Sequence, residues 1–311
     1  MFIVAGLPCS MRINGIITRK NGENLPPADT SNIVSPIYQL AGNRDVNDFE
    51  QSGDDDFSFA IPGLSRFRVS AYKQSGALSV VIRIISFSLP NPTEIGIPQR
   101  IIDFSNFSKG LVLVTGTAGS GKSTTLACII DAINHHYRKH IITLEDPLEF
   151  LHRHDLSIVS QREINVDTES YVTALRVSLR QRPDVILLGE MRDYETMQVA
   201  MTAAETGHLI FSTLHTIGAA STIDRIIDVF PPNQQHQIAV QLSMVLQAVI
   251  SQQLVPTIDG KMIPVFEIMT VTPAIRNMIR DNQDHRPTQH HKLKEKIERN
   301  LFAGSFHFVK I

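Results

Sequence analysis

The sequence predicts a small α+β domain followed by a larger α/β domain built on a mostly parallel sheet. From residue 101 onward, short apolar runs alternate with helical patterns, which is typical of a parallel sheet covered by helices on both faces. Before that point, apolar and polar residues alternate with a period of two, as in half-exposed strands. Residues 89–100 hold three prolines and one glycine and are the predicted linker. We therefore expect domains at 1–88 and 101–283, followed by a divergent tail at 284–311.

Length and composition limit the class of protein. The 311 residues, 42% of them hydrophobic, suffice for two ordinary cores. The net charge of −2 gives no overall basic character, so we expect no nucleic-acid partner. Two cysteines, Cys9 and Cys128, cannot build a disulfide framework, and thiol-poor chains are usually cytosolic. The apolar start has no basic residue before it and Pro8 precedes its cysteine, which argues against a signal peptide. No apolar run reaches about eighteen residues, so a cytoplasmic protein without a membrane span is expected.

The first domain contains a predicted β-hairpin. Residues 66–72 and 78–85 alternate with a period of two and are joined by a short polar segment. Arg68 lies on the polar face of the first strand, and Arg83 interrupts the second. Both arginines are either solvated edge residues or face a charged ligand across an interface. The other elements expected in this domain are a weak helix and two polar loops, at 30–40, 21–28 and 51–56.

The second domain contains five candidate buried strands. They are short and apolar, at residues 111–115, 140–145, 158–162, 184–189 and 208–213. Ligands of parallel sheets bind beyond the carboxyl ends of the strands, where polar residues follow here. The elements expected after residue 231 are a long helix, a short strand and a short helix, at 234–253, 262–268 and 273–280.

A glycine-rich phosphate-binding loop follows the first of these strands. The run fits the spacing G-x-x-x-x-G-K-[ST] and lies between a buried strand and a helix start. Its backbone N–H groups are expected to bind a polyphosphate, with Lys122 on the β- and γ-phosphates and Ser123 on Mg²⁺. The alternative is a glycine-rich turn that matches by chance. The predicted nucleotide-binding residues are Gly116, Thr117, Ala118, Gly119, Ser120, Gly121, Lys122, Ser123 and Thr124.

Carboxylates gather at the ends of two further strands. Glu145 and Glu149, with Asp146 between them, follow the second strand, where they either hold Mg²⁺ or form a solvated loop. Glu190 follows the fourth strand, directly after Gly189, which occupies the place where an ordinary Walker B strand has Asp. Glu190 is therefore the candidate that orients and deprotonates the attacking water, unless it only begins a helix. Glu145 is counted as a candidate for catalysis as well as for the metal.

Histidines and arginines complete the candidate site. His208 and His215 lie at the two ends of the fifth strand, as γ-phosphate sensors or as structural residues. Metal ligation is less expected of them, because no cysteine or third histidine joins them at ligand spacing. Arg176 and Arg180 lie four residues apart on one polar face of a predicted helix. These arginines are either surface charges or contacts to phosphate or to a neighbouring subunit.

Taken together, these motifs resemble those of the type IV pilus retraction ATPases, the PilT-like branch of the secretion-ATPase superfamily, over residues 5–283. Residues 116–123 match the Walker A run, residues 143–150 the aspartate box and residues 187–193 the atypical Walker B motif. The histidine box spans residues 202–216. Residues 274–280 resemble the short motif of the retraction branch.

The resemblance implies a RecA-like ATPase domain preceded by a PAS-like domain, assembled as a homohexamer. ATP and Mg²⁺ are the implied cofactors, with ATP between the two domains and Arg68 and Arg83 reaching its phosphates. Arg176 and Arg180 are the implied arginines of the motor domain. The implied activity is ATP hydrolysis that drives pilus retraction and twitching motility through an inner-membrane platform protein, to which the chain is peripheral.

Three departures from the family pattern affect these expectations. The chain begins inside the family's first strand, so an incomplete first domain is expected. Thr117 and Ala118 replace a common Pro-Thr pair, which backbone binding tolerates, and the end after Asp284 does not follow the pattern. The alternatives that we consider are an extension or secretion ATPase, a nucleotide-gated scaffold with little turnover, and a nucleic-acid translocase, which the charge balance disfavours.

Overall fold

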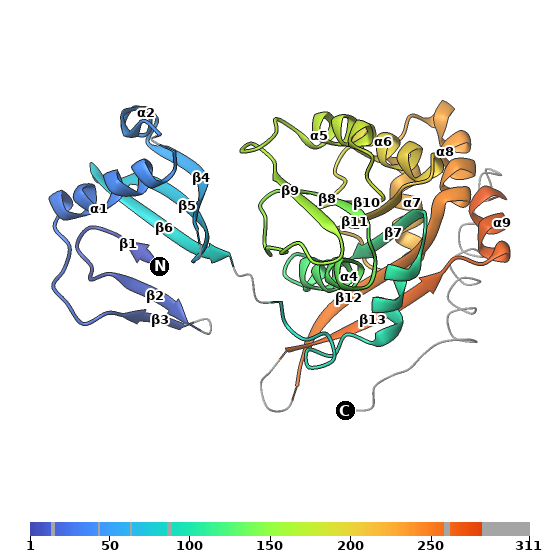
Figure 1. The fold of residues 1–311 in the computed structure, drawn as a ribbon, viewed down its shortest axis with the longest axis horizontal. Coiled ribbons are helices and arrows are strands. Elements are labelled where there is room, and N and C mark those ends of the chain that lie inside the picture. Colours follow the sequence, from blue (N-terminus) through green and yellow to red (C-terminus); the bar gives the residue numbers. More distant parts are fainter. Residues whose placement is uncertain (14–15, 43, 63, 86–88, 258–261, 282–311) are drawn as a thin grey trace. The chain divides into compact units, whose positions relative to one another are not determined.

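The structure is a computed structural model that describes residues 1–13, 16–42, 44–62, 64–85, 89–257 and 262–281. It divides into two compact units, Met1–Phe87 and Ser88–Ile311, which we describe separately (Figure 1). The predicted tail at 284–311 lies outside the described residues. Residues 89–98 of the predicted linker contain no helix or strand.

The first unit is a six-stranded antiparallel sheet in the order β3-β2-β1-β6-β5-β4. Its strands are β1 (Phe2–Ile3), β2 (Ser10–Ile13), β3 (Ile16–Arg19), β4 (Asp54–Ile61), β5 (Ser65–Gln74) and β6 (Ala77–Ile85). The helices α1 (Pro27–Leu40) and α2 (Val46–Ser52) share one core with the sheet. In that core the ring of Tyr38 packs edge-on against Phe57, with centroids 4.7 Å apart. The helix expected near 30–40 and the hairpin of β5 and β6 are confirmed.

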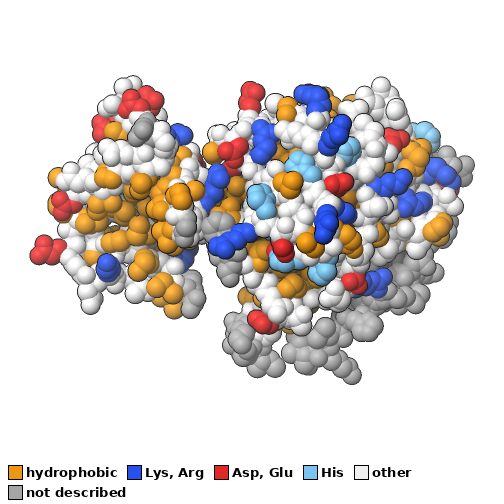
Figure 2. Space-filling view, in the orientation of Figure 1, with side chains coloured by type: hydrophobic (Ala, Val, Ile, Leu, Met, Phe, Trp, Pro, Cys, Tyr) orange, Lys and Arg blue, Asp and Glu red, His pale blue; other side chains and the backbone are white. Residues whose placement is uncertain are grey.

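The loop expected at 51–56 is wrong. Helix α2 continues to Ser52 and ends at Gly53, whose φ of +86° suits a glycine. Strand β4 then begins at Asp54, and its alternate residues Phe57 and Phe59 are buried. The three consecutive aspartates at 54–56 indicated a loop rather than a strand, because aspartate is depleted in strands. The space-filling view in Figure 2 shows apolar side chains gathered on one face of this unit.

The second unit is a seven-stranded sheet in the order β13-β12-β7-β11-β10-β8-β9. All neighbouring pairs are parallel except β12 with β13. All five expected strands are present, with ends shifted by a residue at most, as β7 (Gly110–Thr115), β8 (His140–Glu145), β9 (Ile158–Glu163), β10 (Val185–Leu188) and β11 (Leu209–Leu214). The remaining strands are β12 (Leu246–Pro256) and β13 (Met262–Thr270).

Helices cover both faces of this sheet, as the sequence predicts (Figure 1). Alternate residues of β7 divide between two cores, because successive side chains of a strand point to opposite faces. Leu111 and Leu113 pack with α5 (Tyr171–Ser178), α6 (Tyr194–Glu205), α7 (Ala219–Asp228), α8 (Pro232–Val245) and α9 (Pro273–Asp281). Val112 and Val114 pack with α3 (Gln99–Ile102), the 3₁₀ turn η1 (Asp103–Asn106) and α4 (Lys122–His136). A second 3₁₀ turn, η2 (Leu179–Gln181), follows α5.

The long helix expected at 234–253 is only half correct. Helix α8 ends at Val245, and the following residues form β12, which pairs with β7 on one side and β13 on the other. Ala248, Val249 and Ile250 are fully buried there. A short apolar run fits a buried helix and a buried strand equally well, so its periodicity could not decide between them. The expected strand at 262–268 and helix at 273–280 are confirmed as β13 and α9.

Candidate nucleotide-binding site

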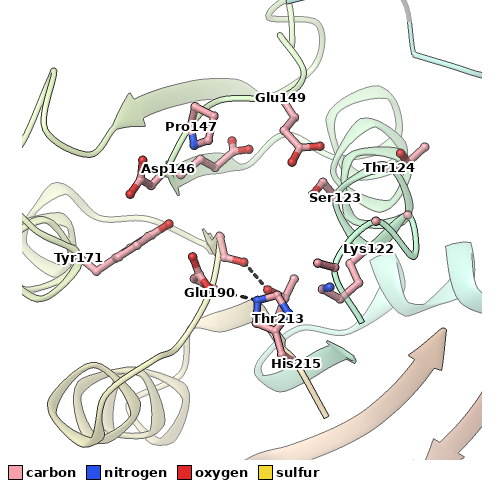
Figure 3. A pocket seen from close by; sticks show the side chains of 15 residues that line it. Lys122, Ser123, Thr124, Asp146, Pro147, Glu149, Tyr171, Glu190, Thr213 and His215 are labelled. Atoms are coloured by element: carbon pink, nitrogen blue, oxygen red, sulfur yellow. Dashed lines mark hydrogen bonds and ion pairs between the residues drawn. The ribbon is translucent and has the colours of Figure 1, made fainter. Parts of the chain in front are cut away.

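A cavity of about 420 Å³ opens at the carboxyl ends of β8, β10 and β11 of the second unit. Its wall includes six residues of the glycine-rich loop and the start of α4, namely Ala118, Gly119, Gly121, Lys122, Ser123 and Thr124. The opposite wall carries the acidic residues that follow β8 and β10, together with His215 (Figure 3). The structure therefore brings together the loop, the acids and one histidine of the predicted site.

The glycine-rich loop has the conformation that an anion site requires. Gly119 and Gly121 have φ of +77° and +87°, which favour glycine. Helix α4 begins at Lys122, and no side chain caps its first turn. The free N–H groups at this end of the helix are available to an anion, which the helix dipole also favours. Gly116, Thr117 and Ser120 do not line the cavity.

Lys122 is held by the loop itself. Its ammonium Nζ donates to the backbone carbonyls of Thr117 at 2.8 Å and Gly116 at 3.0 Å. Burial lowers the pKa of Lys122, while the nearby carboxylates of Glu190 and Glu149 raise it. The ammonium is thus satisfied by neutral carbonyls only, and a phosphate oxygen would be the stronger acceptor.

Two predicted metal ligands line the cavity with Ser123. Glu145 ends β8, Glu149 follows it, and both face the start of α4. Burial, together with the nearby charge of Glu149, raises the pKa of Glu145 to about 7. Among the described residues, no three His, Cys, Asp or Glu side chains form a complete metal cage. An incomplete set of oxygen donors beside a phosphate loop fits Mg²⁺, which retains waters and takes phosphate oxygens as ligands.

Glu190 is the acid at the end of β10. Its side chain is 12% exposed, and its Oε1 lies 2.6 Å from a guanidinium nitrogen of Arg192. The ring Nε2 of His215 lies 3.3 Å from its other oxygen, Oε2. Thr213 donates to the carbonyl of Gly189 at 2.6 Å, which fixes the backbone just before Glu190. Helix α6 begins only at Tyr194, capped by Asp193, so Glu190 does not begin that helix.

Packing explains why glycine precedes Glu190. A Cβ on Gly189 would lie 2.8 Å from the hydroxyl of Tyr171 and 3.3 Å from the backbone of Glu145. An aspartate, the residue of an ordinary Walker B strand, would therefore require Tyr171 and the β8 backbone to shift. Tyr171 itself lines the cavity beside Glu190 (Figure 3). No motif marks Tyr171 in the sequence, where it is only the first residue of α5.

The other candidate residues do not line this cavity. His208 lies at the amino end of β11, the opposite edge of the sheet, where its Nδ1 lies 2.9 Å from the carbonyl oxygen of Ala203. Arg176 is exposed and pairs with Glu195 at 2.7 Å. Arg180 is exposed and has no ion pair within the described part of the chain. Arg68 and Arg83 belong to the first unit, where they are direct cross-strand partners.

The parallel sheet, the glycine-rich loop after β7 and the acids after β8 and β10 define a P-loop nucleoside triphosphatase with a RecA-like core. The chain belongs to the type II/IV secretion system protein family, whose model matches residues 9–262. The described residues include no helix that is both long and apolar enough to span a membrane.

Relatives and solved structures agree with this family. The type IV pilus retraction ATPase PilT of Pseudomonas aeruginosa is 46% identical over 283 residues, which cover 91% of this chain and 81% of that protein. A twitching motility protein of Neisseria gonorrhoeae is 43% identical, over 88% of this chain and 72% of that protein. A crystal structure of the pilus retraction motor PilT with bound ADP matches with a TM-score of 0.86 at 43% identity, covering 95% of this chain and 84% of that one.

Proposed function

We propose that this chain is a motor ATPase whose hydrolysis of ATP powers retraction of a type IV pilus and hence twitching motility. The observation that carries the proposal is the position of Glu190, which faces the phosphate loop across one cavity in a chain 46% identical to a pilus retraction ATPase. Relatives named for type II secretion match a smaller share of this chain, for example 61% for that of Aeromonas hydrophila against 91% for PilT. This difference favours retraction over secretion.

The loop binds the polyphosphate. Backbone N–H groups of residues 117–123 take the phosphate oxygens, and Lys122 exchanges its two carbonyl partners for the β- and γ-phosphates. Ser123, Glu145 and Glu149 hold Mg²⁺, directly or through water. When bound, the ion neutralises charge on the phosphates.

Glu190 orients the attacking water and accepts its proton. Its contacts to His215 and Arg192 hold the carboxylate in place before the substrate arrives. Because His215 lies on the cavity wall, it is also placed to respond to the γ-phosphate.

Arginines outside this cavity act in the assembled motor. Arg68 and Arg83 lie opposite each other on β5 and β6 and supply positive charge to the phosphates. Arg176 and Arg180 are exposed on α5 and η2 and serve the contacts between subunits of a homohexamer. The first unit serves as the PAS-like domain. The motor works in the cytoplasm and transmits its force to an inner-membrane platform protein of the pilus. His208, at the amino end of β11 and outside the cavity, takes no step of this hydrolysis within one subunit.

The proposal is tested with purified protein and with cells. Phosphate release is measured with MgATP, and assembly state by light scattering in the same sample. We expect turnover that depends on Mg²⁺ and on assembly. Binding without turnover would instead favour a nucleotide-gated scaffold. Deletion in the source organism is expected to leave surplus, unretracted pili, whereas loss of all pili would identify an extension ATPase.

A further inference from the structure

A buried glutamine lies directly beneath the phosphate loop. Gln252 belongs to β12, the parallel neighbour of β7, and is only 2% exposed. The register pairs Ser251 with Thr115, the last residue of β7. Gln252 therefore lies level with Gly116, the first residue of the loop, although the two are far apart in the sequence.

Gln252 contacts the loop and its helix at three points. Its backbone carbonyl oxygen occupies the space that a Cβ on Gly116 would need. Its side-chain Nε2 lies 2.8 Å from the position of a Cβ on Gly121. Its Oε1 accepts a hydrogen bond from the hydroxyl of Thr125, on the first turn of α4, at 2.7 Å. The three contacts therefore lie at the start of the glycine-rich loop, at its end and on the first turn of the helix that follows it.

Such a support matters because the loop is intrinsically flexible. Gly116, Gly119 and Gly121 all have positive φ, so each has access to conformations closed to other residues. A phosphate site binds more tightly when its N–H groups already point toward the phosphate oxygens in the free protein, since ordering them during binding lowers the affinity. The buried side-chain amide of Gln252 lies against the end of the loop at Gly121 and is hydrogen-bonded to the start of α4, so it restricts those alternatives.

We propose that Gln252 is a positioning residue that holds the loop in the shape that receives the phosphates of a nucleoside triphosphate. The inference rests on the proposed function, because it requires the loop to be the nucleotide site. A glutamine that only fills the core would affect folding stability and leave nucleotide affinity unchanged in the folded protein.

The test compares Gln252→Met with Gln253→Met. Gln253 is the adjacent residue on the exposed face of the same strand, so it is a matched control for residue type and position. The full chain is titrated with a nonhydrolysable ATP analogue and Mg²⁺ by calorimetry, and unfolding is followed with urea. We expect Gln252→Met to weaken the Kd about tenfold, as for the loss of one buried hydrogen bond, and Gln253→Met to remain within twofold of wild type.

A second variant tests the specific contact. Thr125→Val removes the hydroxyl while keeping a side chain of similar volume, and we expect it to weaken the Kd about threefold. In the double variant the losses should not multiply, because both substitutions break the same hydrogen bond. Should Gln252→Met fail to fold, wild-type affinity in Thr125→Val would overturn the inference.

The outcomes separate the two proposals. If wild type and Gln253→Met bind the analogue and folded Gln252→Met binds it equally well, the positioning role is wrong and the proposed function stands. If the losses of Gln252→Met and Thr125→Val multiply, the positioning contact is likewise wrong. If wild type itself does not bind the analogue, both proposals are overturned.

Discussion

The ring Nε2 of His215 lies 3.3 Å from Oε2 of Glu190, so a histidine holds the proposed catalytic base. We expect His215→Gln to lower kcat at least tenfold, because removal of a residue that orients a general base costs part of the 10²–10⁴-fold contribution of that base. The KM for ATP should change little. Steady-state phosphate release checks both values.

His208→Gln is the matched comparison for His215. This histidine lies at the other end of β11 and outside the cavity, with a hydrogen bond to the end of α6. We expect a kcat within twofold of wild type. A tenfold loss in a folded His208→Gln protein would restore His208 to the catalytic set and contradict the arrangement described for one subunit.

Gly189 and Tyr171 form a steric pair that a double substitution can test. A Cβ at Gly189 would meet the Tyr171 hydroxyl at 2.8 Å, so Gly189→Ala should destabilise the protein by about 1–3 kcal/mol through overpacking. Tyr171→Phe removes that hydroxyl and should recover part of the loss, since the contact at 3.3 Å to the β8 backbone remains. Urea unfolding of the four proteins measures the interaction, and simple additivity would refute it.

His152 makes stability depend on pH. Burial, together with the nearby charge of His135, lowers the pKa of His152 to about 4. The unfolded chain, with a histidine pKa near 6.5, therefore binds a proton that the folded chain resists. Stability from this residue is complete above pH 6.5 and is lost as the pH falls toward 4. Between pH 7 and pH 5 we expect a loss of at most about 2 kcal/mol.

The control for this pH effect is His152→Phe, which cannot titrate. Urea unfolding of both proteins at pH 7 and pH 5, without nucleotide or Mg²⁺, isolates the contribution of His152 because every other group is shared. Equal pH dependence in the two proteins would show that His152 does not resist protonation in the folded state.

Arg68 and Arg83 are cross-strand partners on β5 and β6, and a guanidinium nitrogen of Arg68 lies 3.8 Å from Asp56 Oδ2. We expect Arg68→Ala and Arg83→Ala each to lower kcat about tenfold, the effect of losing one charged contact to the phosphates. Arg19→Ala, at an exposed position on β3, should leave kcat unchanged. Equal turnover in all three variants would make these arginines ordinary surface charges.

Elements whose signal lies in a few consecutive residues could be predicted from the sequence. The loop at 116–123 follows fixed spacing, and its glycines have the dihedrals that the spacing requires. The strands β7, β8, β10 and β11 are buried on both faces, so each is a continuous apolar run that needs no tertiary information. Because parallel strands end at one edge, the convergence of Glu145, Glu190 and His215 also followed from the sequence.

Residues that act through distant contacts gave no such signal. Gln252 lies 127 residues from Thr125 and reaches it only because β12 pairs with β7. The first part of β12 was itself predicted to be helical. Tyr171 joins the site because α5 begins beside Gly189, a relationship set by packing. The sequence placed His208 and His215 at the two ends of one strand, and of the two only His215, at the carboxyl end of β11, lies on the cavity wall.

The most direct test of the account is hydrolysis by Glu190→Gln, measured as single-turnover phosphate release with nucleotide affinity determined on the same sample. The amide keeps the size of the side chain but cannot accept a proton. We predict that the rate falls by about 10²–10⁴-fold while the Kd for MgATP stays within a few-fold of wild type. A protein that binds MgATP and hydrolyses it at the wild-type rate would contradict the assignment of Glu190 as the base.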